Sequence, residues 1–383
     1  MDFQKRKMEK MGLKLFGDIY KGKKVLVTGN TGFKGSWLTL WLQELGAQVT
    51  GFADTIPTTP SFYKANQLDE SITQVWGDIR DLAAVTSTIH EVKPDFIFHL
   101  AAQALVKESL KNPLDTFAIN GMGTANVMNA LRDVKFNCKV VFITSDKCYE
   151  NVEWVWGYKE TDRLGGKDPY SASKAVAEIV FHSFFHTYFA NHAHVKVASA
   201  RAGNVIGGGD WAMDRIVPDC VKQWSDKQTV NIRRPRSTRP WQHVLEPLGG
   251  YLLTGAALAS PKTHVHGESF NFGPPSNQNF CVEELIKDLA KYWTHGDALK
   301  LINIEEDKSF YEAGLLKLNT DKALASLNWQ PVLNYNETMK FTGEWYNYFY
   351  GESVNSIALK EFSYKQILHY IETASNKSIE WMS

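Results

Sequence analysis

Short apolar runs rich in β-branched residues alternate with longer segments of mixed polarity through the first half of this 383-residue chain. Several runs are apolar at nearly every position, which is typical of strands in a parallel sheet that is covered on both faces. The predicted strands are Lys24–Thr28, Gln48–Phe52, Thr73–Trp76, Asp95–Leu100, Lys139–Thr144 and Val195–Ala200.

The segments between these runs repeat their apolar residues at helical spacing. The first begins at Ser36 and ends at Gly46, a natural C-terminal cap. Further helices are predicted over residues 81–92, 114–133 and 171–190. Because strands and helices alternate, and such crossovers are right-handed, the pattern predicts an α/β fold with a doubly wound, Rossmann-type parallel sheet.

The pattern changes after residue 205, where three glycines, an arginine-rich loop over 233–239 and isolated helices over 282–293 and 321–327 follow. This change predicts a smaller, mainly helical C-terminal domain. We expect an N-terminal extension over 1–22, a sheet domain over 23–205 with returns from about 240–265, and an interleaved C-terminal domain over 206–383.

Composition and charge exclude several classes of protein. The chain is 44% hydrophobic and 22% charged, and its 42 basic residues balance 42 acidic ones, so no net field favours nucleic acid or a membrane surface. No apolar run approaches the roughly 18 residues of a membrane span, and the N-terminus does not resemble a signal peptide. Four cysteines without zinc spacing predict reduced thiols, no metal site and a cytoplasmic location.

Three glycines, Gly29, Gly32 and Gly35, follow the first predicted strand and open the first predicted helix. In a dinucleotide loop the first allows a tight turn, the second lets backbone approach a pyrophosphate, and the third lets the helix pack against the strand. A plain turn is the alternative, because the spacing is not the usual G-x-G-x-x-G. The position favours a dinucleotide site that also includes Thr31 and Phe33, which makes residues 23–205 a NAD(P)-type domain.

Asp54 follows the second predicted strand, and neither Arg nor Lys stands beside it in the sequence. A carboxylate there accepts hydrogen bonds from the adenosine ribose and repels a 2′-phosphate, so NAD is favoured over NADP. A solvated turn residue is the alternative. Asp78 and Ile79, after the third strand, are predicted to border the adenine, and the alternative for Asp78 is to cap the next helix.

Tyr170 and Lys174 are four residues apart and share a helix face, at a helix start marked by Asp168-Pro169. A neighbouring ammonium favours the phenolate and is expected to lower the tyrosine pKa toward working pH. The preceding strand ends in Thr144-Ser-Asp-Lys147, at the sheet edge where open α/β folds bind ligands. A pair of surface residues is the alternative, but this context predicts a site for hydride chemistry.

With these motifs the chain resembles the extended short-chain dehydrogenases/reductases over at least residues 23–345. Three longer phrases are similar to the nucleotide-sugar 4,6-dehydratases that act on CDP-glucose. They are Gly32-Phe-Lys-Gly-Ser-Trp37, Thr144-Ser-Asp-Lys-Cys-Tyr-Glu-Asn151 and Asp168-Pro-Tyr-Ser-Ala-Ser-Lys174.

The resemblance implies a NAD-dependent lyase with an internal redox cycle. Tyr170, helped by Lys174 and Ser145, takes the proton of the sugar 4-hydroxyl while hydride leaves C4, water is lost across C5 and C6, and the hydride returns to C6. The implied product is CDP-4-dehydro-6-deoxy-D-glucose, which feeds deoxysugar and lipopolysaccharide O-antigen synthesis. The loop Leu100-Ala101-Ala102 is implied to lie along the cofactor.

Asp146 and Lys147 distinguish a dehydratase from a simple dehydrogenase. Asp146 is expected to protonate the 6-hydroxyl, which requires a raised pKa in a closed site. Lys147 replaces the glutamate base of dTDP-type enzymes, and its role as base, relay or electrostatic stabiliser stays open. A surface ion pair is the alternative for the two.

Arginine suits bidentate contacts with a diphosphate, and four of the seven residues from Arg233 to Arg239 are arginines. A solvated basic loop and a nucleic-acid patch are the alternatives, and balanced charge argues against the second. By resemblance, Arg239 meets the diphosphate. The other expected substrate-binding residues are Gln103, Asn204, Arg215 and Arg234.

Two rival functions remain at this stage. A nucleotide-sugar 4-epimerase would need Tyr170 and Lys174 but not Asp146 and Lys147, and a non-catalytic NAD-binding regulator is possible because fold does not fix function. The base of the nucleotide cannot be derived from the residues. The resemblance implies a homodimer or higher homo-oligomer through the helices over 114–133 and 171–190.

Overall fold

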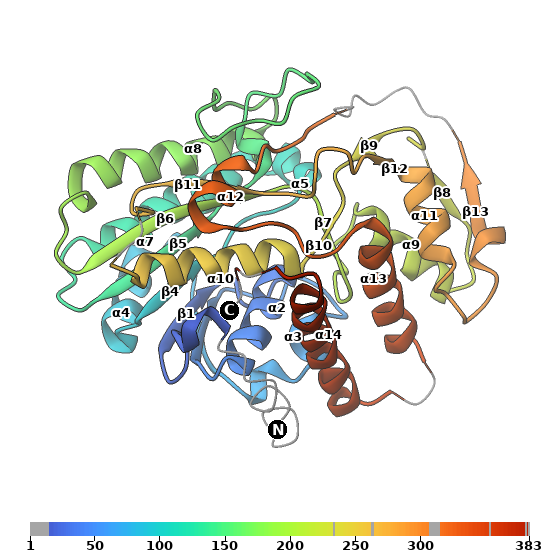
Figure 1. The fold of residues 1–383 in the computed structure, drawn as a ribbon, viewed down its shortest axis with the longest axis horizontal. Coiled ribbons are helices and arrows are strands. Elements are labelled where there is room, and N and C mark those ends of the chain that lie inside the picture. The colour runs from blue at the N-terminus through green and yellow to red at the C-terminus, as the bar shows by residue number, and fades with distance from the viewer. Residues whose placement is uncertain are drawn as a thin grey trace.

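The computed structural model of the chain describes residues 15–232, 234–261, 264–305, 315–351, 354–379 and 381. Its centre is a seven-stranded parallel sheet in the order β11-β6-β5-β4-β1-β2-β3 (Figure 1). The predicted doubly wound Rossmann-type sheet is therefore confirmed. The strands are β1 (Lys24–Thr28), β2 (Gln48–Ala53), β3 (Thr73–Trp76), β4 (Phe96–His99), β5 (Cys138–Ile143), β6 (Val195–Ala202) and β11 (Ser269–Phe272).

The strand order reverses at β1, which pairs in parallel with β2 on one side and with β4 on the other. Chain connections leave this point in opposite directions, and open α/β sheets bind ligands at such a reversal, outside the carboxyl ends of the strands. The predicted cofactor loop follows β1, and the residues after His99 follow β4.

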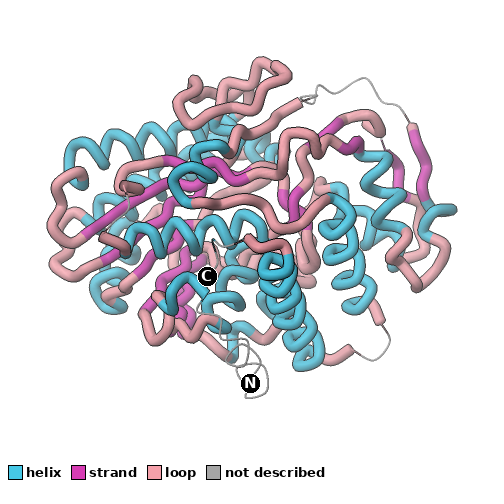
Figure 2. The backbone as a smooth tube through the Cα atoms, in the orientation of Figure 1, coloured by secondary structure: helices cyan, strands magenta, loops and turns pink. Residues whose placement is uncertain are grey.

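Helices cover both faces of the sheet, as its apolar strands require (Figure 2). Along β1, Val25 and Val27 join the larger core cluster while Leu26 joins the smaller one on the other face. Cluster membership places α2 (Phe33–Glu44) and α10 (Leu245–Ala259) on the first face. The second face is covered by α4 (Leu82–Val92), α7 (Gly123–Leu131) and α8 (Pro169–Phe184).

Two of the predicted helices contain π-helical turns. The helix predicted over 114–133 consists of α6 (Pro113–Phe117), a π-turn (Ala118–Met122) and α7, and α8 continues into a second π-turn (Phe185–Phe189). Such turns often occur at functional sites. The first predicted helix begins earlier than expected, at Phe33, and Gly46 follows it with a φ of 78°, the left-handed conformation of a helix end.

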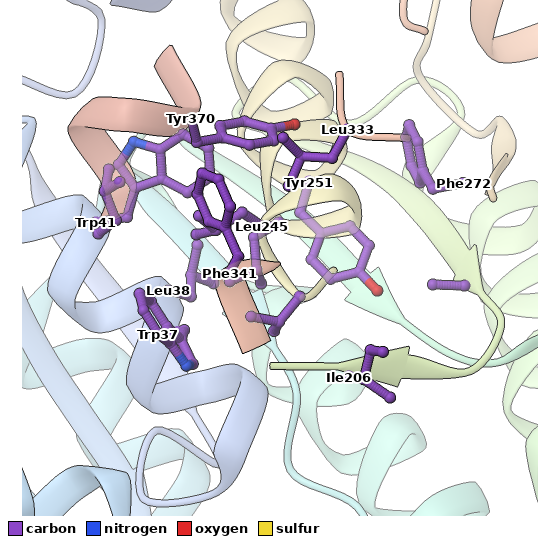
Figure 3. Packing of buried hydrophobic residues seen from close by; sticks show 14 of the residues in the cluster. Trp37, Leu38, Trp41, Ile206, Leu245, Tyr251, Phe272, Leu333, Phe341 and Tyr370 are labelled. Atoms are coloured by element: carbon purple, nitrogen blue, oxygen red, sulfur yellow. The ribbon is translucent and has the colours of Figure 1, made fainter. Parts of the chain in front are cut away.

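The C-terminal part interleaves with the sheet, because α10 returns to it within the predicted range 240–265 and β11 adds a further strand that was not predicted. The last helix packs on α2, where the rings of Trp41 and Tyr370 meet edge to face at 5.7 Å (Figure 3). The remaining longer helices are α9 (Ile216–Ser225), α11 (Val282–Ala290), α12 (Asp321–Leu327), α13 (Tyr335–Phe349) and α14 (Ser356–Asn376). Short helices are α3 (Phe62–Ala65) and α5 (Val106–Lys111), and short strand pairs are β7 (Val205–Ile206) with β10 (Gln242–His243), β8 (Val230–Ile232) with β13 (Ile302–Ile304), and β9 (Thr238–Arg239) with β12 (Phe280–Cys281).

The described part of the N-terminal extension docks on the core. Tyr20 is buried and its hydroxyl donates to the Leu252 carbonyl on α10 at 2.5 Å. Residues 1–14 of the extension lie outside the described residues. Within the part of the chain that the structure describes, no helix combines the length and apolarity needed to cross a bilayer.

Candidate active site

Two glycines between the end of β1 and the first turn of α2 are required by the packing of the backbone around them. Gly29 has a φ of 72°, and a Cβ there would lie 2.7 Å from the Ala101 nitrogen. A Cβ on Gly35 would lie 2.1 Å from the Gly29 carbonyl oxygen, so α2 packs against β1 only with glycine there.

At Gly32, by contrast, the packing of the chain does not require glycine. Its Cβ would meet only the Gly29 oxygen at 3.4 Å, which is ordinary contact, and it forms the N-cap of α2 without a side-chain cap bond. The first amides of α2 are thus available to an anion, and a bare Cα lets that anion approach. The loop therefore fits the diphosphate of a dinucleotide.

The neighbouring segments are fixed against this loop. The Thr31 hydroxyl donates to the Thr55 carbonyl at 2.7 Å, and the amides of Leu100 and Ala101 donate to Thr28 at 3.0 and 3.2 Å. The structure thereby brings Leu100-Ala101-Ala102 beside the glycine loop. Phe33, at the start of α2, faces the loop after β7, because a Cβ on Gly207 would lie 3.3 Å from its ring.

The carboxylates after β2 and β3 have different surroundings. Asp54 is exposed at the end of β2, where Arg80 approaches it although the two are distant in sequence. Arg80 is already engaged, since Asp78 accepts from its side chain at 2.6 Å and Asp115 at 3.0 Å. Asp78 does not cap the following helix, because Asp81 takes that role. Ile79 is buried, and its carbonyl accepts from the Asn126 side chain at 3.0 Å.

Ser145, Asp146 and Tyr170 meet in a buried cluster at the carboxyl edge of the sheet. The Ser145 hydroxyl donates to Asp146 at 2.9 Å, accepts from the Lys147 amide at 3.2 Å and hydrogen bonds to the Tyr170 phenol. The Lys147 ammonium lies 5.7 Å from the centroid of the Tyr170 ring. Asp168 caps α8 by accepting from the Ser171 amide at 3.0 Å, which fixes Tyr170 in the first turn.

Burial dominates the ionisation of this cluster. It raises the pKa of Tyr170 to about 12 despite the Ser145 hydrogen bond, so the predicted lowering of that pKa does not hold in this structure. Burial likewise lowers the pKa of Lys174 to about 8. Burial raises the pKa of Asp146, as an acid at this site requires, although Lys147 and Ser145 oppose the shift.

A third lysine, which the sequence motifs did not single out, lies in the same site. The Lys34 ammonium is 3.5 Å from the hydroxyl of Tyr251, whose ring projects from α10 toward Ile206 (Figure 3). Burial lowers the pKa of Lys34 to about 7, Arg215 lowers it further and Asp146 raises it. A cation in the first turn of a helix opposes the helix dipole, and this conflict is the signal by which the sequence could have indicated it.

Two predicted substrate-binding residues, Asn204 and Arg215, lie near this cluster, and a third, Gln103, is bound by groups of its own loop and of α6. Asn204 is half-buried between β6 and β7, beside Gly203, whose Cβ would lie 3.1 Å from Asp146 Oδ2. Arg215 bonds to Asp210 at 2.7 Å and lies close enough to influence Tyr170. The Gln103 side chain is bound by neighbouring groups, since it donates to Thr116 at 2.9 Å and accepts from the Leu105 amide at 2.5 Å.

Asn120, which sequence reasoning missed, connects the Gln103 loop to α8, the helix that carries Tyr170 and Lys174. It lies in the π-turn before α7, and its amide donates to the Gln103 carbonyl at 3.0 Å and to the Ser173 hydroxyl at 2.8 Å. No local motif announces it, because its partners come from two other elements.

The predicted arginine loop lies in the C-terminal part. Arg239 belongs to strand β9, which pairs with β12, and its guanidinium donates to the Thr238 carbonyl at 2.8 Å. Arg234 precedes it in a turn closed by the Ser237 amide at 3.2 Å, and Arg233 lies outside the described residues.

His99 is held within the core by hydrogen bonds to two threonines. It is buried at the end of β4, with Nδ1 2.8 Å from the Thr28 hydroxyl and Nε2 3.4 Å from that of Thr124. Burial lowers its pKa to about 3, which keeps the ring neutral.

A glycine loop at the strand-order reversal, beside a buried Ser–Tyr–Lys cluster, defines an extended short-chain dehydrogenase/reductase. Residues 26–342 match the family described as GDP-mannose 4,6 dehydratase, and the chain belongs to this family. The family membership predicted from the motifs is confirmed.

Individual relatives share most of the chain. The CDP-glucose 4,6-dehydratase of Salmonella typhimurium is 43% identical over 351 residues, which cover 90% of this chain and 97% of that protein. The UDP-glucose 4-epimerase of Mycoplasma pneumoniae is 26% identical, with 85% and 97% covered. The solved dTDP-glucose 4,6-dehydratase of Streptomyces venezuelae, with NAD and TYD bound, is similar in fold, with a TM-score of 0.71, 22% identity, and 84% and 96% covered.

Proposed function

We propose that the chain is a NAD-dependent lyase that converts CDP-D-glucose to CDP-4-dehydro-6-deoxy-D-glucose with loss of water. The identity of 43% to a CDP-glucose 4,6-dehydratase supports this, against 26% to a UDP-glucose 4-epimerase. The observation that carries the proposal is the position of Asp146 and Lys147 beside Tyr170. Epimerisation at C4 has no use for an acid and a cation at that position.

NAD fits the glycine loop, and when bound it would accept hydride from the sugar and return it. The proposed cofactor contacts are the amides at the start of α2 for the diphosphate and Asp54 for the adenosine ribose. Tyr170 and Lys174 face the nicotinamide end, with Leu100-Ala101-Ala102 alongside. The remaining proposed contacts are Gly29, Thr31, Gly32, Phe33, Gly35, Asp78 and Ile79.

Different residues of the chain carry out the different proton transfers of the reaction. Tyr170, hydrogen bonded to Ser145, takes the proton of the 4-hydroxyl as its phenolate, which the Lys174 ammonium one helical turn away would favour against the burial that raises the Tyr170 pKa. Asp146, whose pKa burial raises, gives a proton to the departing 6-hydroxyl. Lys147 faces the C5 side, where a proton must leave. Together these transfers release one water and leave a 4-ketone conjugated to a C5–C6 double bond. Return of the hydride to C6 and of a proton to C5 would then give the C6 methyl group.

The nucleotide end of the substrate is assigned to the C-terminal part. Arg234 and Arg239 meet the diphosphate, since arginine offers paired donors to phosphate oxygens. Arg215, Asn204 and Gln103 lie around the sugar. The closeness of Arg215 and of the Asn204 loop to the Tyr170–Asp146 cluster supports this assignment.

A homodimer through α6, the following π-turn and α8 is part of the proposal. Leu114, Met122 and Ile179 are 83%, 59% and 55% exposed, which is unusual for large apolar side chains on packed helices. A second copy would cover them by two-fold symmetry. We expect Ile179→Asp to give a folded monomer in analytical ultracentrifugation, and an unchanged dimer would exclude this face.

We further propose a cytoplasmic location and a role in deoxysugar synthesis for lipopolysaccharide. Cys138, Cys148, Cys220 and Cys281 are all unpaired, which suits a reducing compartment. The 4-ketone of the product is a substrate for reductases and aminotransferases.

Incubation with CDP-, dTDP-, UDP- and GDP-glucose tests the proposal, because a 4-keto-6-deoxy sugar absorbs strongly in alkali and an epimer does not. We expect this absorbance with CDP-glucose above all. Absorbance with none of the four would exclude a dehydratase, and preference for another nucleotide would exclude only the CDP assignment.

A further inference from the structure

Glu178 lies one helical turn beyond Lys174 on α8, as Lys174 lies one turn beyond Tyr170. Its carboxylate is fully buried and forms an ion pair of 2.7 Å with Arg201 on β6, which is also fully buried. A buried ion pair is costly to desolvate and often adds no net stability, so its place directly behind the catalytic pair calls for a further reason.

The Glu178 carboxylate accepts hydrogen bonds from hydroxyl groups at three strands. Thr144 donates to it from the end of β5, Ser199 donates from β6 at 3.1 Å, and Ser269 donates from β11 at 3.4 Å. Thr144 directly precedes Ser145. The carboxylate therefore joins the catalytic helix to the strand end that carries the catalytic serine.

Arg201 fixes the other end of the same segment. Its Nη1 donates to the Tyr149 hydroxyl at 2.7 Å and to the Glu160 carbonyl at 3.1 Å, and the Tyr149 hydroxyl donates to Asn271 at 2.8 Å. The ion pair thus holds Thr144 at one end and Tyr149 at the other. Between them stand Ser145, Asp146 and Lys147.

The charge of Glu178 also acts on Lys174. Burial opposes ionisation of Glu178, but Arg201 and the hydroxyl groups hold its pKa below the ordinary value, so it is an anion. Burial lowers the pKa of Lys174 to about 8, and Glu178 opposes this. The titratable and charged groups that act on Lys174 from the packed elements are Glu178 on α8, Cys148 after β5, Lys34 on α2 and His99 on β4.

We propose that Glu178 is a positioning residue of the active site, which keeps Lys174 in its ammonium form and, with Arg201, holds the segment from Thr144 to Tyr149 in place. The inference rests on the proposed function, because that function assigns Tyr170 and Lys174 their catalytic roles. A purely structural ion pair would stabilise the fold and leave the ionisation of Lys174 unchanged.

Titration of Lys174 by NMR of the full chain with ¹³Cε-labelled lysine tests this directly, and the Lys174→Arg variant assigns the signal. In Glu178→Gln we expect the Lys174 pKa to fall by about 1 unit or more. Glu178→Asp, which keeps the charge, restores most of the difference. The titration needs no substrate. Its result on Glu178 is therefore independent of whether the proposed reaction is confirmed or excluded.

Glu246→Gln is the matched control, because Glu246 is equally buried but binds the Val332 and Leu333 amides and Tyr370. We expect it to leave Lys174 unchanged. If Glu178→Gln does not fold because Arg201 is left unpaired, the double variant Glu178→Gln with Arg201→Met removes both charges, and the same fall is expected. A folded variant of either kind with an unchanged Lys174 pKa would overturn the proposal.

Discussion

At the scale of single residues, opposing influences act on the pKa of Asp146. Burial raises its pKa, whereas Lys147, the Ser145 hydrogen bond and Lys34 lower it. An acid works best when its pKa lies near the operating pH, and these cations oppose the rise in the Asp146 pKa that burial causes. Lys147 was evident from the motif, but Lys34 was not, because its proximity to Asp146 depends on how α2 meets the sheet.

Replacing Lys34 by Met tests this balance. Loss of its charge raises the pKa of Asp146, so the protonated acid persists to higher pH while becoming a weaker donor. We expect slower water loss and an alkaline limb of the pH–rate profile that moves upward. Lys64→Met, which removes an exposed lysine paired with Asp69, is the control, and identical profiles in the two variants would contradict the role of Lys34.

Lys147→Met and Lys147→Arg separate the possible roles of that lysine. We expect the Met variant to bind NAD and to lose water at least 100-fold more slowly, since ~2.7 kcal/mol of transition-state stabilisation corresponds to this factor. Arginine keeps the charge but cannot act as a base. Activity in the Arg variant would assign electrostatic stabilisation, inactivity would assign proton transfer, and full turnover of the Met variant would remove Lys147 from the mechanism.

At the scale of elements, strands β1, β2, β4, β5 and β6 were predictable because most of their residues are buried and apolar, and β3, which is half polar and partly exposed, was predicted from its place in the alternation. Strand β11 was not, since Ser269-Phe-Asn-Phe272 is short and half polar. Helix α10 was seen only as a return, because it is apolar nearly all round and carries no clear period. The Ser145–Lys147 and Tyr170–Lys174 motifs are local in sequence, whereas most of their supports come from other elements: Lys34, Asn120, Arg201 and Tyr251. Glu178 lies on α8 itself, but the groups that bind it lie on β6 and β11 and at the end of β5.

The glycine loop between β1 and α2 gives a prediction at this scale. A methyl group on Gly35 would meet the Gly29 carbonyl, so Gly35→Ala should destabilise the fold by about 1–3 kcal/mol or more. Gly32→Ala should leave stability nearly unchanged and weaken NAD binding at least tenfold, or about 1.4 kcal/mol. Urea unfolding and NAD titration by calorimetry check both, and equal NAD affinity of Gly32→Ala and the unmodified chain would exclude this loop as the diphosphate site.

At the scale of the whole molecule, Glu246 ties the C-terminal region to the sheet. It lies on α10 and accepts from the Leu333 amide at 2.6 Å and from Tyr370 on α14 at 3.0 Å. Burial raises its pKa to about 7. No sequence pattern predicts this contact, because α10 and α14 are separated by most of the C-terminal part.

This raised pKa makes stability depend on pH. The folded state holds the proton more tightly than the unfolded state, so the contribution is complete below pH 4.5 and is lost as the pH rises to about 7. Glu246→Gln does not titrate. We expect urea unfolding to shift in favour of the variant by about 3 kcal/mol between these limits, whereas a difference that stays constant with pH would contradict the ionisation of Glu246.

The fate of the hydrogen on C4 tests the proposed reaction most directly. We expect CDP-glucose carrying deuterium at C4 to give a 4-keto-6-deoxy product with that deuterium in its C6 methyl group, without added reductant, as measured by mass spectrometry and NMR. Asp146 and Lys147 have a role only if hydride moves from C4 to C6 in this way. Deuterium that returns to C4 in an epimerised hexose, or that is lost to solvent, would contradict the proposed dehydratase.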